Sequence, residues 1–88
     1  MTKTDSLIDF PTDFPIKVIG KPENNFQAKI LEIFTRHADD FDPSTATLRY
    51  SKSNQYISLT CTIKANSQQQ LDALYNDLST FPQTIMVF

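Results

Sequence analysis

Apolar and polar residues alternate strictly from Tyr56 to Ala65, and this run is the clearest pattern in the sequence. A period of two sustained over this length predicts a β-strand with one face in the core and the other face open. A shorter alternating run occupies residues 45–50, and the polar segment 51–55 between the two runs predicts a turn. We therefore expect a β-hairpin over residues 44–65, with these side chains of its second strand in the core: Ile57, Leu59, Cys61 and Ile63.

Two further strands are predicted outside this hairpin. Residues 14–19 (FPIKVI) alternate with their first, third and fifth side chains on one face, which predicts a first strand. Residues 85–88 (IMVF) form a short apolar run, which predicts a final strand. Gly20 is the only glycine in the chain, so we expect it to supply a positive φ in the turn after the first strand.

Two segments show the spacing of amphipathic helices, residues 23–37 and 67–80. Ser67 and Gln70 form a capping box, in which the serine hydroxyl accepts from the Gln70 N–H while the Gln70 side chain reaches back to the cap. Pro82 ends the second helix. The side chains that repeat at helical spacing are Phe26, Ile30, Ile33, Phe34 and His37 in the first segment and Leu71, Leu74, Tyr75 and Leu78 in the second.

The predicted order of elements is β-α-β-β-α-β. Right-handed crossovers then place both helices on one face of a four-stranded antiparallel sheet of order 4-1-3-2, which is an α+β, ferredoxin-like sandwich. Residues 1–88 form one domain, because a second core needs roughly 50 more residues, and residues 1–6 are expected to be a loose tail. The open face should carry Lys17, Tyr56 and Lys64, together with the interface candidates Thr45, Thr47, Arg49, Ser58, Thr60 and Thr62.

Composition narrows the classes of partner. The formal net charge is −2 and the sequence pI is about 5.1, which opposes binding to phosphate backbones, so we expect no nucleic-acid partner. Residues 1–10 contain no long apolar run, so neither a signal peptide nor a membrane span is expected, and the cytoplasm is the expected compartment. The single cysteine, Cys61, is expected to be a buried small hydrophobe, and no disulfide follows from it.

Catalytic chemistry has one candidate, His37 with the acidic segment Asp39–Asp42. A histidine near a helix C-terminus is also favoured by the helix dipole, and a short acidic run is also typical of a solvated loop. The sequence contains no nucleophile beside a base, no phosphate loop and no HExxH pattern. Acylphosphatases share this topology, but they need an arginine in the loop after the first strand, and residues 20–25 (GKPENN) contain none. We therefore expect a non-catalytic protein with no cofactor and no metal.

Two binding sites can be predicted. Gly20, Asn24 and Asn25 lie between the first strand and the first helix, where backbone N–H groups can hold a small anion or an amino acid; a plain turn is the alternative. The second predicted strand is an edge that Arg49 shields only in part, so self-association through the sheet face or edge is also expected.

Four segments together resemble the YbeD-like family of small bacterial proteins: residues 7–20 (LIDFPTDFPIKVIG), the pair Arg36-His37, residues 51–58 (SKSNQYIS) and residues 71–78 (LDALYNDL). The resemblance implies a ferredoxin-like fold similar to the ACT-type regulatory domain of amino-acid metabolic enzymes. It also implies a regulatory or metabolite-sensing role with a link to lipoate metabolism, and it carries over no catalytic residues. The turn Lys52-Ser53-Asn54 departs from the family, which has glycine after the lysine. The resulting hypothesis is a regulatory or interaction module that binds a small metabolite or a protein partner.

Overall fold

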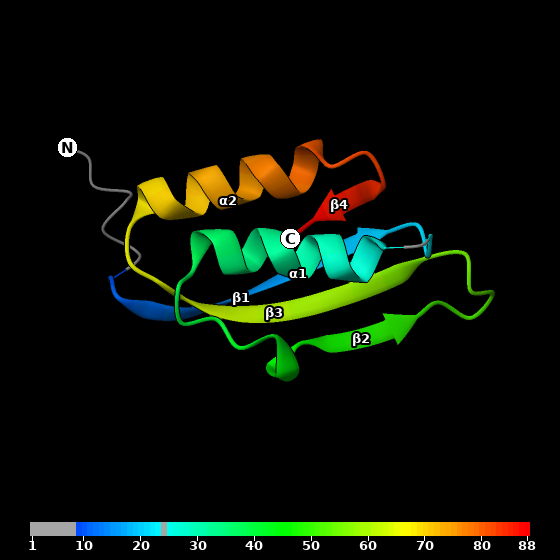
Figure 1. The fold of residues 1–88 in the computed structure, drawn as a ribbon, viewed down its shortest axis with the longest axis horizontal. Helices are drawn as coiled ribbons and strands as arrows, with labels where there is room; N and C mark the ends of the chain where they lie inside the picture. Colours follow the sequence, from blue (N-terminus) through cyan, green and yellow to red (C-terminus); the bar gives the residue numbers. More distant parts are fainter. Residues whose placement is uncertain (1–8, 24) are drawn as a thin grey trace.

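The structure is a computed structural model that describes residues 9–23 and 25–88. The candidate ligand residue Asn24 and the predicted tail, residues 1–6, lie outside the described residues. The described chain contains four strands and two α-helices in the predicted order, with one additional 3₁₀ turn (Figure 1). The elements are β1 (Thr12–Gly20), α1 (Phe26–His37), η2 (Pro43–Thr45), β2 (Thr47–Tyr50), β3 (Ile57–Ala65), α2 (Gln68–Thr80) and β4 (Thr84–Val87).

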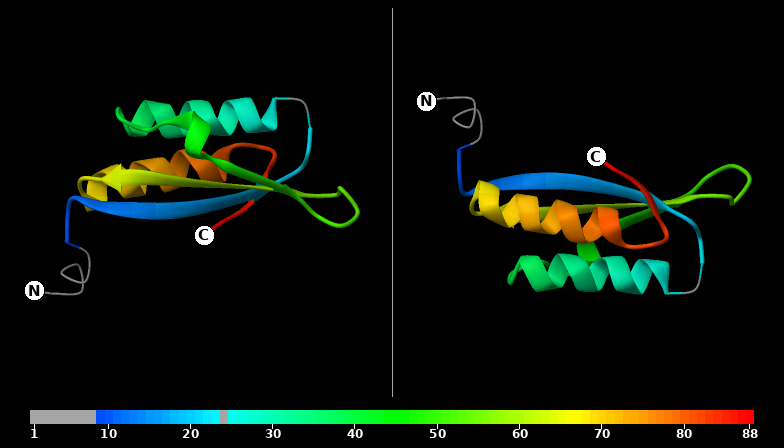
Figure 2. Two further views of the ribbon diagram at one scale, coloured as in Figure 1. Left: turned by 90° about the horizontal axis from the view of Figure 1, so that it is seen from below. Right: turned by 90° about the horizontal axis from the view of Figure 1, so that it is seen from above.

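The sheet has the order β2-β3-β1-β4, and every neighbouring pair is antiparallel. This is the predicted order 4-1-3-2, read from the other edge. The longest ladder joins β1 to β3, from Thr12 opposite Ala65 to Gly20 opposite Ile57. Both helices lie on the same side of the sheet, as the two views of Figure 2 show. The fold is therefore ferredoxin-like, and no element among the described residues covers the other face of the sheet.

The core lies between the sheet and the two helices. Cys61, in the middle of β3, is fully buried as a free thiol, and this burial raises the pKa of the thiol to about 12. The prediction that Cys61 is a core residue is confirmed. The other fully buried large side chains are Ile16, Val18, Phe26, Ile30, Phe34, Leu59, Ile63, Leu71, Leu74 and Leu78.

The predicted start of the second strand was wrong. Thr45, the first residue of the predicted strand, belongs to the 3₁₀ turn η2 (Pro43–Thr45), and β2 begins at Thr47. The Asp42 carboxylate accepts from both the N–H and the hydroxyl of Ser44, at 3.0 and 2.7 Å, and the Thr45 hydroxyl donates to the Asp42 carbonyl at 2.7 Å. These local bonds satisfy the backbone without a strand. Thr45 is therefore not part of the open sheet face.

The predicted role of Gly20 was also wrong. No described glycine has a positive φ, and the left-handed positions are Asn25 at 74° and Asn54 at 59°. Asparagine tolerates this conformation better than most residues. A Cβ on Gly20 would collide with the ring of Phe26 and would lie 2.8 Å from the Gln83 carbonyl oxygen. Glycine is required here by close packing, because its single hydrogen leaves room for the phenyl ring.

None of the described helices is long and apolar enough to cross a membrane.

Candidate functional site

The uncovered face of the sheet is organised in rows by strand register. One row runs across all four strands as Arg49, Ser58, Ile19 and Met86. The next row contains Thr47, Thr60 and Lys17, and Phe88 follows Lys17 because these two residues exchange both backbone hydrogen bonds, at 3.2 and 2.8 Å. Side chains of opposed residues share a face of the sheet. The open face therefore includes Met86 and Phe88 in addition to the predicted polar residues.

The structure places five of the six interface candidates on this face. Ser58 and Thr60 are half-buried, and the exposed members are Thr47, Arg49 and Thr62. Sequence reasoning missed Met86 and Phe88, because an uninterrupted apolar run of four residues shows no alternation from which a face could be assigned. Met86 is 48% exposed and Phe88 is 58% exposed.

One end of the open face is both apolar and basic. A cavity of about 340 Å³ is lined there by Ile19, Tyr56 and Ser58, among others, with Lys17 and Arg49 on its walls. Tyr56 is 47% exposed at this end of the face. Contiguous exposed apolar patches mark interaction sites more often than single exposed apolar residues do. Because Lys17 and Arg49 line this cavity together with Ile19 and Tyr56, its chemistry suits an apolar group that carries a negative charge.

The predicted ligand loop is arranged differently from the prediction. Gly20 is buried against Phe26 and does not line the neighbouring cavity. Asn25 lines that cavity of about 340 Å³, and its side chain makes no capping hydrogen bond to α1. Glu23 and Tyr50 line it as well. The Glu23 carboxylate opposes an anion at this position, so the geometry suits a neutral or cationic group better than a small anion, which was one of the two kinds of ligand predicted.

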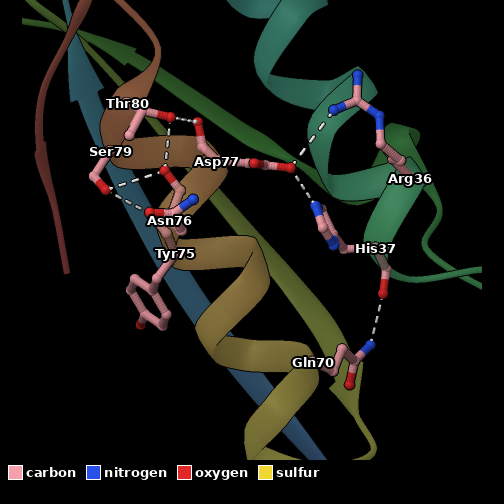
Figure 3. Close-up of polar contacts among 8 residues, drawn as sticks. All are labelled: Arg36, His37, Gln70, Tyr75, Asn76, Asp77, Ser79 and Thr80. Carbon is pink, nitrogen blue, oxygen red and sulfur yellow. Dashed lines mark hydrogen bonds and ion pairs between the residues drawn. The ribbon is translucent and has the colours of Figure 1, made fainter.

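His37 lies in a polar contact between the two helices (Figure 3). Its Nε2 is 2.5 Å from Oδ2 of Asp77 on α2, and the same oxygen is 3.6 Å from Nη1 of Arg36. The carbonyl of His37 also accepts from the Gln70 side chain at 2.8 Å. The other end of that amide, Gln70 Oε1, accepts from the Asn66 N–H at 2.6 Å. This cluster joins the C-terminal end of α1 to α2.

The capping box of α2 is confirmed in its first half. The Ser67 hydroxyl accepts from the Gln70 N–H at 3.0 Å, as predicted. The Gln70 side chain reaches back one residue further than predicted, to Asn66, and it also binds His37 on α1. The cap therefore has a second, tertiary role that spacing along one helix could not reveal.

The predicted grouping of His37 with Asp39–Asp42 is wrong, because the imidazole pairs with Asp77. Asp42 is occupied by Ser44, and the hydroxyl and N–H of Ser44 lower the pKa of the Asp42 carboxyl. Hydroxyl groups on α2 donate hydrogen bonds to backbone carbonyls of the same helix. The Ser79 hydroxyl, for example, donates to the carbonyl of Tyr75 at 2.7 Å. The cavity beside Asp77 and Arg36, about 340 Å³ in volume, is not lined by His37. The cluster is arranged to hold two helices together.

Metal binding has no candidate in the part of the chain that the structure describes, since no three His, Cys, Asp or Glu side chains there are grouped to hold an ion.

The fold defines the class of protein as a ferredoxin-like α+β domain, and it is similar to the fold of an ACT domain. Protein HP0495 from H. pylori matches with a TM-score of 0.75 at 13% identity, covering 100% of this chain and 96% of that chain. The ACT domain from the GTP pyrophosphokinase of Chlorobium tepidum matches with a TM-score of 0.68 at 19% identity, covering 88% of this chain and 97% of that domain. At these identities the likeness shows the fold alone.

The chain belongs to the family described as "Protein of unknown function (DUF493)", whose model matches residues 5–88. UPF0250 protein NE1487 of Nitrosomonas europaea is 46% identical over 83 residues, which cover 94% of this chain and 95% of the relative. A UPF0250 protein of Leptothrix cholodnii is 42% identical over 85 residues, which cover 97% of this chain and 93% of the relative. The family indicated by the sequence resemblance is confirmed.

Proposed function

We propose that this protein is a non-catalytic regulatory or interaction module of the cytoplasm, which binds a partner enzyme, a second copy of itself or a small metabolite through its sheet. The observation that carries the proposal is the uncovered sheet face, where exposed Met86 and Phe88 lie opposite Ile19 and Lys17. On the same face, exposed Tyr56 lines a cavity together with Lys17 and Arg49. No described element of the chain covers this face. Exposure of these apolar side chains to water is unfavourable, and binding of a partner would remove them from water.

The class of the fold supports a regulatory role. ACT-type domains are regulatory domains of metabolic enzymes, and one of the similar structures is the ACT domain of a GTP pyrophosphokinase. The described part of this chain has a fold similar to that of such a domain. We expect a metabolic enzyme as the type of partner, by analogy with the enzyme to which the similar ACT domain belongs. A cytoplasmic setting is compatible with the free thiol of Cys61.

The metabolite part of the proposal concerns the basic and apolar corner. A small carboxylic acid with an apolar chain suits a cavity that is lined by Ile19, Lys17 and Arg49. A lipoate-related acid has this chemistry, as do several apolar amino acids at their carboxyl ends. A ligand that binds only the folded state stabilises it by RT ln(1 + [L]/Kd), so binding is visible as a rise in melting temperature.

The test is a thermal-shift screen of amino acids and lipoate-related acids against the full chain. A positive compound should lose its effect with Arg49→Gln, which removes a guanidinium from the cavity wall. Lys64→Gln is the matched control, since Lys64 lies on the same face at the opposite end, opposite Asp13. A screen without any stabilising compound, or an effect lost equally in both variants, contradicts the metabolite part of the proposal.

A further inference from the structure

One half of the open sheet face carries cations without carboxylates. Lys17 on β1 and Arg49 on β2 are both exposed, and the strand register places them in adjacent rows of this face. They line the same cavity, and no acidic residue of the described chain contributes to its lining. The ion pairs formed among the described residues all lie on α1 and α2. No such pair therefore neutralises the charge of Lys17 or Arg49.

The carboxylates of this face lie at its other end. Asp13 is the only acidic residue in the four described strands, and it lies opposite Lys64. Asp40 and Asp42 line a separate cavity of about 330 Å³ together with Asp13. The formal net charge of the whole chain is −2, so the cationic half is a local feature and does not reflect a basic composition. An anionic partner is attracted to the Lys17 end and repelled from the Asp13 end, which determines where on the face it binds.

The cationic half is also the apolar half of the open face. Met86 is 48% exposed and lies opposite Ile19. Phe88 is 58% exposed and lies opposite Lys17, with which it exchanges two backbone hydrogen bonds. Neither Met86 nor Phe88 lines the cavity shared by the two cations, so the apolar surface extends past the cavity to β4. A small acid that filled the cavity would leave these two side chains in water, whereas a segment of protein is long enough to cover them.

We propose that this basic-apolar half of the face, defined by Lys17, Ile19, Arg49, Met86 and Phe88, binds a segment of a partner protein in which carboxylates flank a large apolar side chain. The inference rests on the proposed function and names the chemistry of its protein partner. The apolar side chain covers the row of Ile19 and Met86, and the carboxylates meet Lys17 and Arg49. Methionine suits such a contact, because its unbranched side chain adapts to the shape of a partner.

Two other occupants suit this surface less well. Single-stranded RNA stacks its bases on aromatic side chains of the central strands. On β1 and β3 the open-face residues around the two cations are Ile19, Ser58 and Thr60, none of which is aromatic. A second copy stacked through the same half of the face would bring Arg49 and Lys17 of the two chains together, and this like-charge contact opposes the pairing. An acidic segment of another protein meets neither obstacle.

Panning of a random peptide library on the immobilised full chain tests the proposal. The enriched peptides should contain acidic residues next to a large apolar residue. Binding of the most enriched peptide, measured by fluorescence anisotropy, should weaken as salt is added, because salt screens exposed charges. Arg49→Gln should weaken binding by at least about fivefold, since a charge-assisted contact is lost. Lys64→Gln removes the same charge at the other end of the face, and as the matched control it should change the affinity by less than about twofold.

Met86→Ser tests the apolar part of the contact. It should weaken binding of the enriched peptide by about threefold or more, because less apolar surface is removed from water. A copy of the peptide with serine in place of its large apolar residue should bind wild type and Met86→Ser equally well. Circular dichroism checks that each variant is folded. Equal losses for the two peptides would overturn the apolar contact at Met86.

The remaining outcomes separate the inference from the proposed function. Enriched peptides without acidic residues, or with equal losses in Arg49→Gln and Lys64→Gln, overturn the acidic partner and leave the interaction module in place. Tighter binding of a single-stranded oligouridylate overturns it in favour of nucleic acid, and a dimer of the chain alone that Met86→Ser dissociates overturns it in favour of a second copy. The absence of any enriched peptide also overturns the inference. Combined with a strict monomer and a thermal-shift screen without a stabilising compound, that absence overturns the proposed function as well.

Discussion

The ring of Phe26 fills the space next to Gly20 where any other residue would carry a Cβ. A Cβ built on Gly20 collides with two ring carbons of Phe26 and lies 2.8 Å from the carbonyl oxygen of Gln83. The same ring packs against Phe81, with 6.2 Å between ring centroids. Gly20 thus allows the first residue of α1 to pack on the end of β1, which sets the position of α1 over the sheet. The single glycine of the chain serves packing, while two asparagines occupy the left-handed positions.

Gly20→Ala should lower the free energy of unfolding by about 1–3 kcal/mol, the usual cost of overpacking a core. Chemical denaturation of the purified variant measures this. Phe26→Leu removes the colliding ring, so Gly20→Ala should cost less in the Phe26→Leu background, by roughly 1 kcal/mol or more. Equal costs in the two backgrounds would show that the contact with Phe26 is not the reason for the glycine.

The contact between His37 and Asp77 should stabilise the packing of α1 on α2. A double-mutant cycle with His37→Gln and Asp77→Asn should give a coupling energy of about 0.5–1 kcal/mol, since the pair is hydrogen-bonded and partly screened by solvent. The exposed pair Lys29 and Glu32, 3.9 Å apart on α1, is the matched control. Its coupling should be about 0.5 kcal/mol or less. A coupling for His37 and Asp77 no larger than the control would contradict the assigned role.

Thr84→Val should stabilise the protein. In the described residues the Thr84 hydroxyl oxygen is buried without a hydrogen-bond partner, and such a group carries an unfavourable desolvation free energy. Valine has nearly the same shape and lacks the hydroxyl, so the free energy of unfolding should rise by about 1 kcal/mol. Thermal and urea unfolding measure the change. An unchanged or lower stability would indicate that the hydroxyl has a hydrogen-bond partner in solution.

The contact of Asp42 with Ser44 should make stability depend on pH. Hydrogen bonds from the Ser44 hydroxyl, and then from its N–H, lower the pKa of Asp42 in the folded state. A lowered folded pKa gives stability above the unfolded pKa, which is lost as the pH falls through the folded pKa. Ser44→Ala should therefore raise the pKa of Asp42, seen by NMR titration of its carboxyl carbon. Ser44→Ala should also lower the free energy of unfolding near neutral pH and change it little at about pH 2. An equal loss of stability at both pH values would assign the effect to the turn backbone instead.

Most of the fold could be predicted from local patterns. The alternation from Ile57 to Ala65 identifies β3 as a strand with one buried face, because every second side chain along a strand points to the same face of the sheet. Helical spacing identifies α1 and α2, and the handedness of crossovers then leaves one strand order. The pattern could not place the end of η2, where hydrogen bonds from Ser44 and Thr45 to Asp42 compete with strand pairing.

The candidate site divides in the same way. By itself the sequence determined which face of β2 and β3 is polar, because the alternating residues Thr47, Arg49 and Ser58 must follow the strand period. Only the tertiary structure decided that Met86 lies beside Ile19 on that face and that Asp77 contacts His37. Side-chain periodicity is a property of each strand or helix, whereas contacts between residues 40 positions or more apart depend on how separate elements pack, and a local pattern carries no record of that packing.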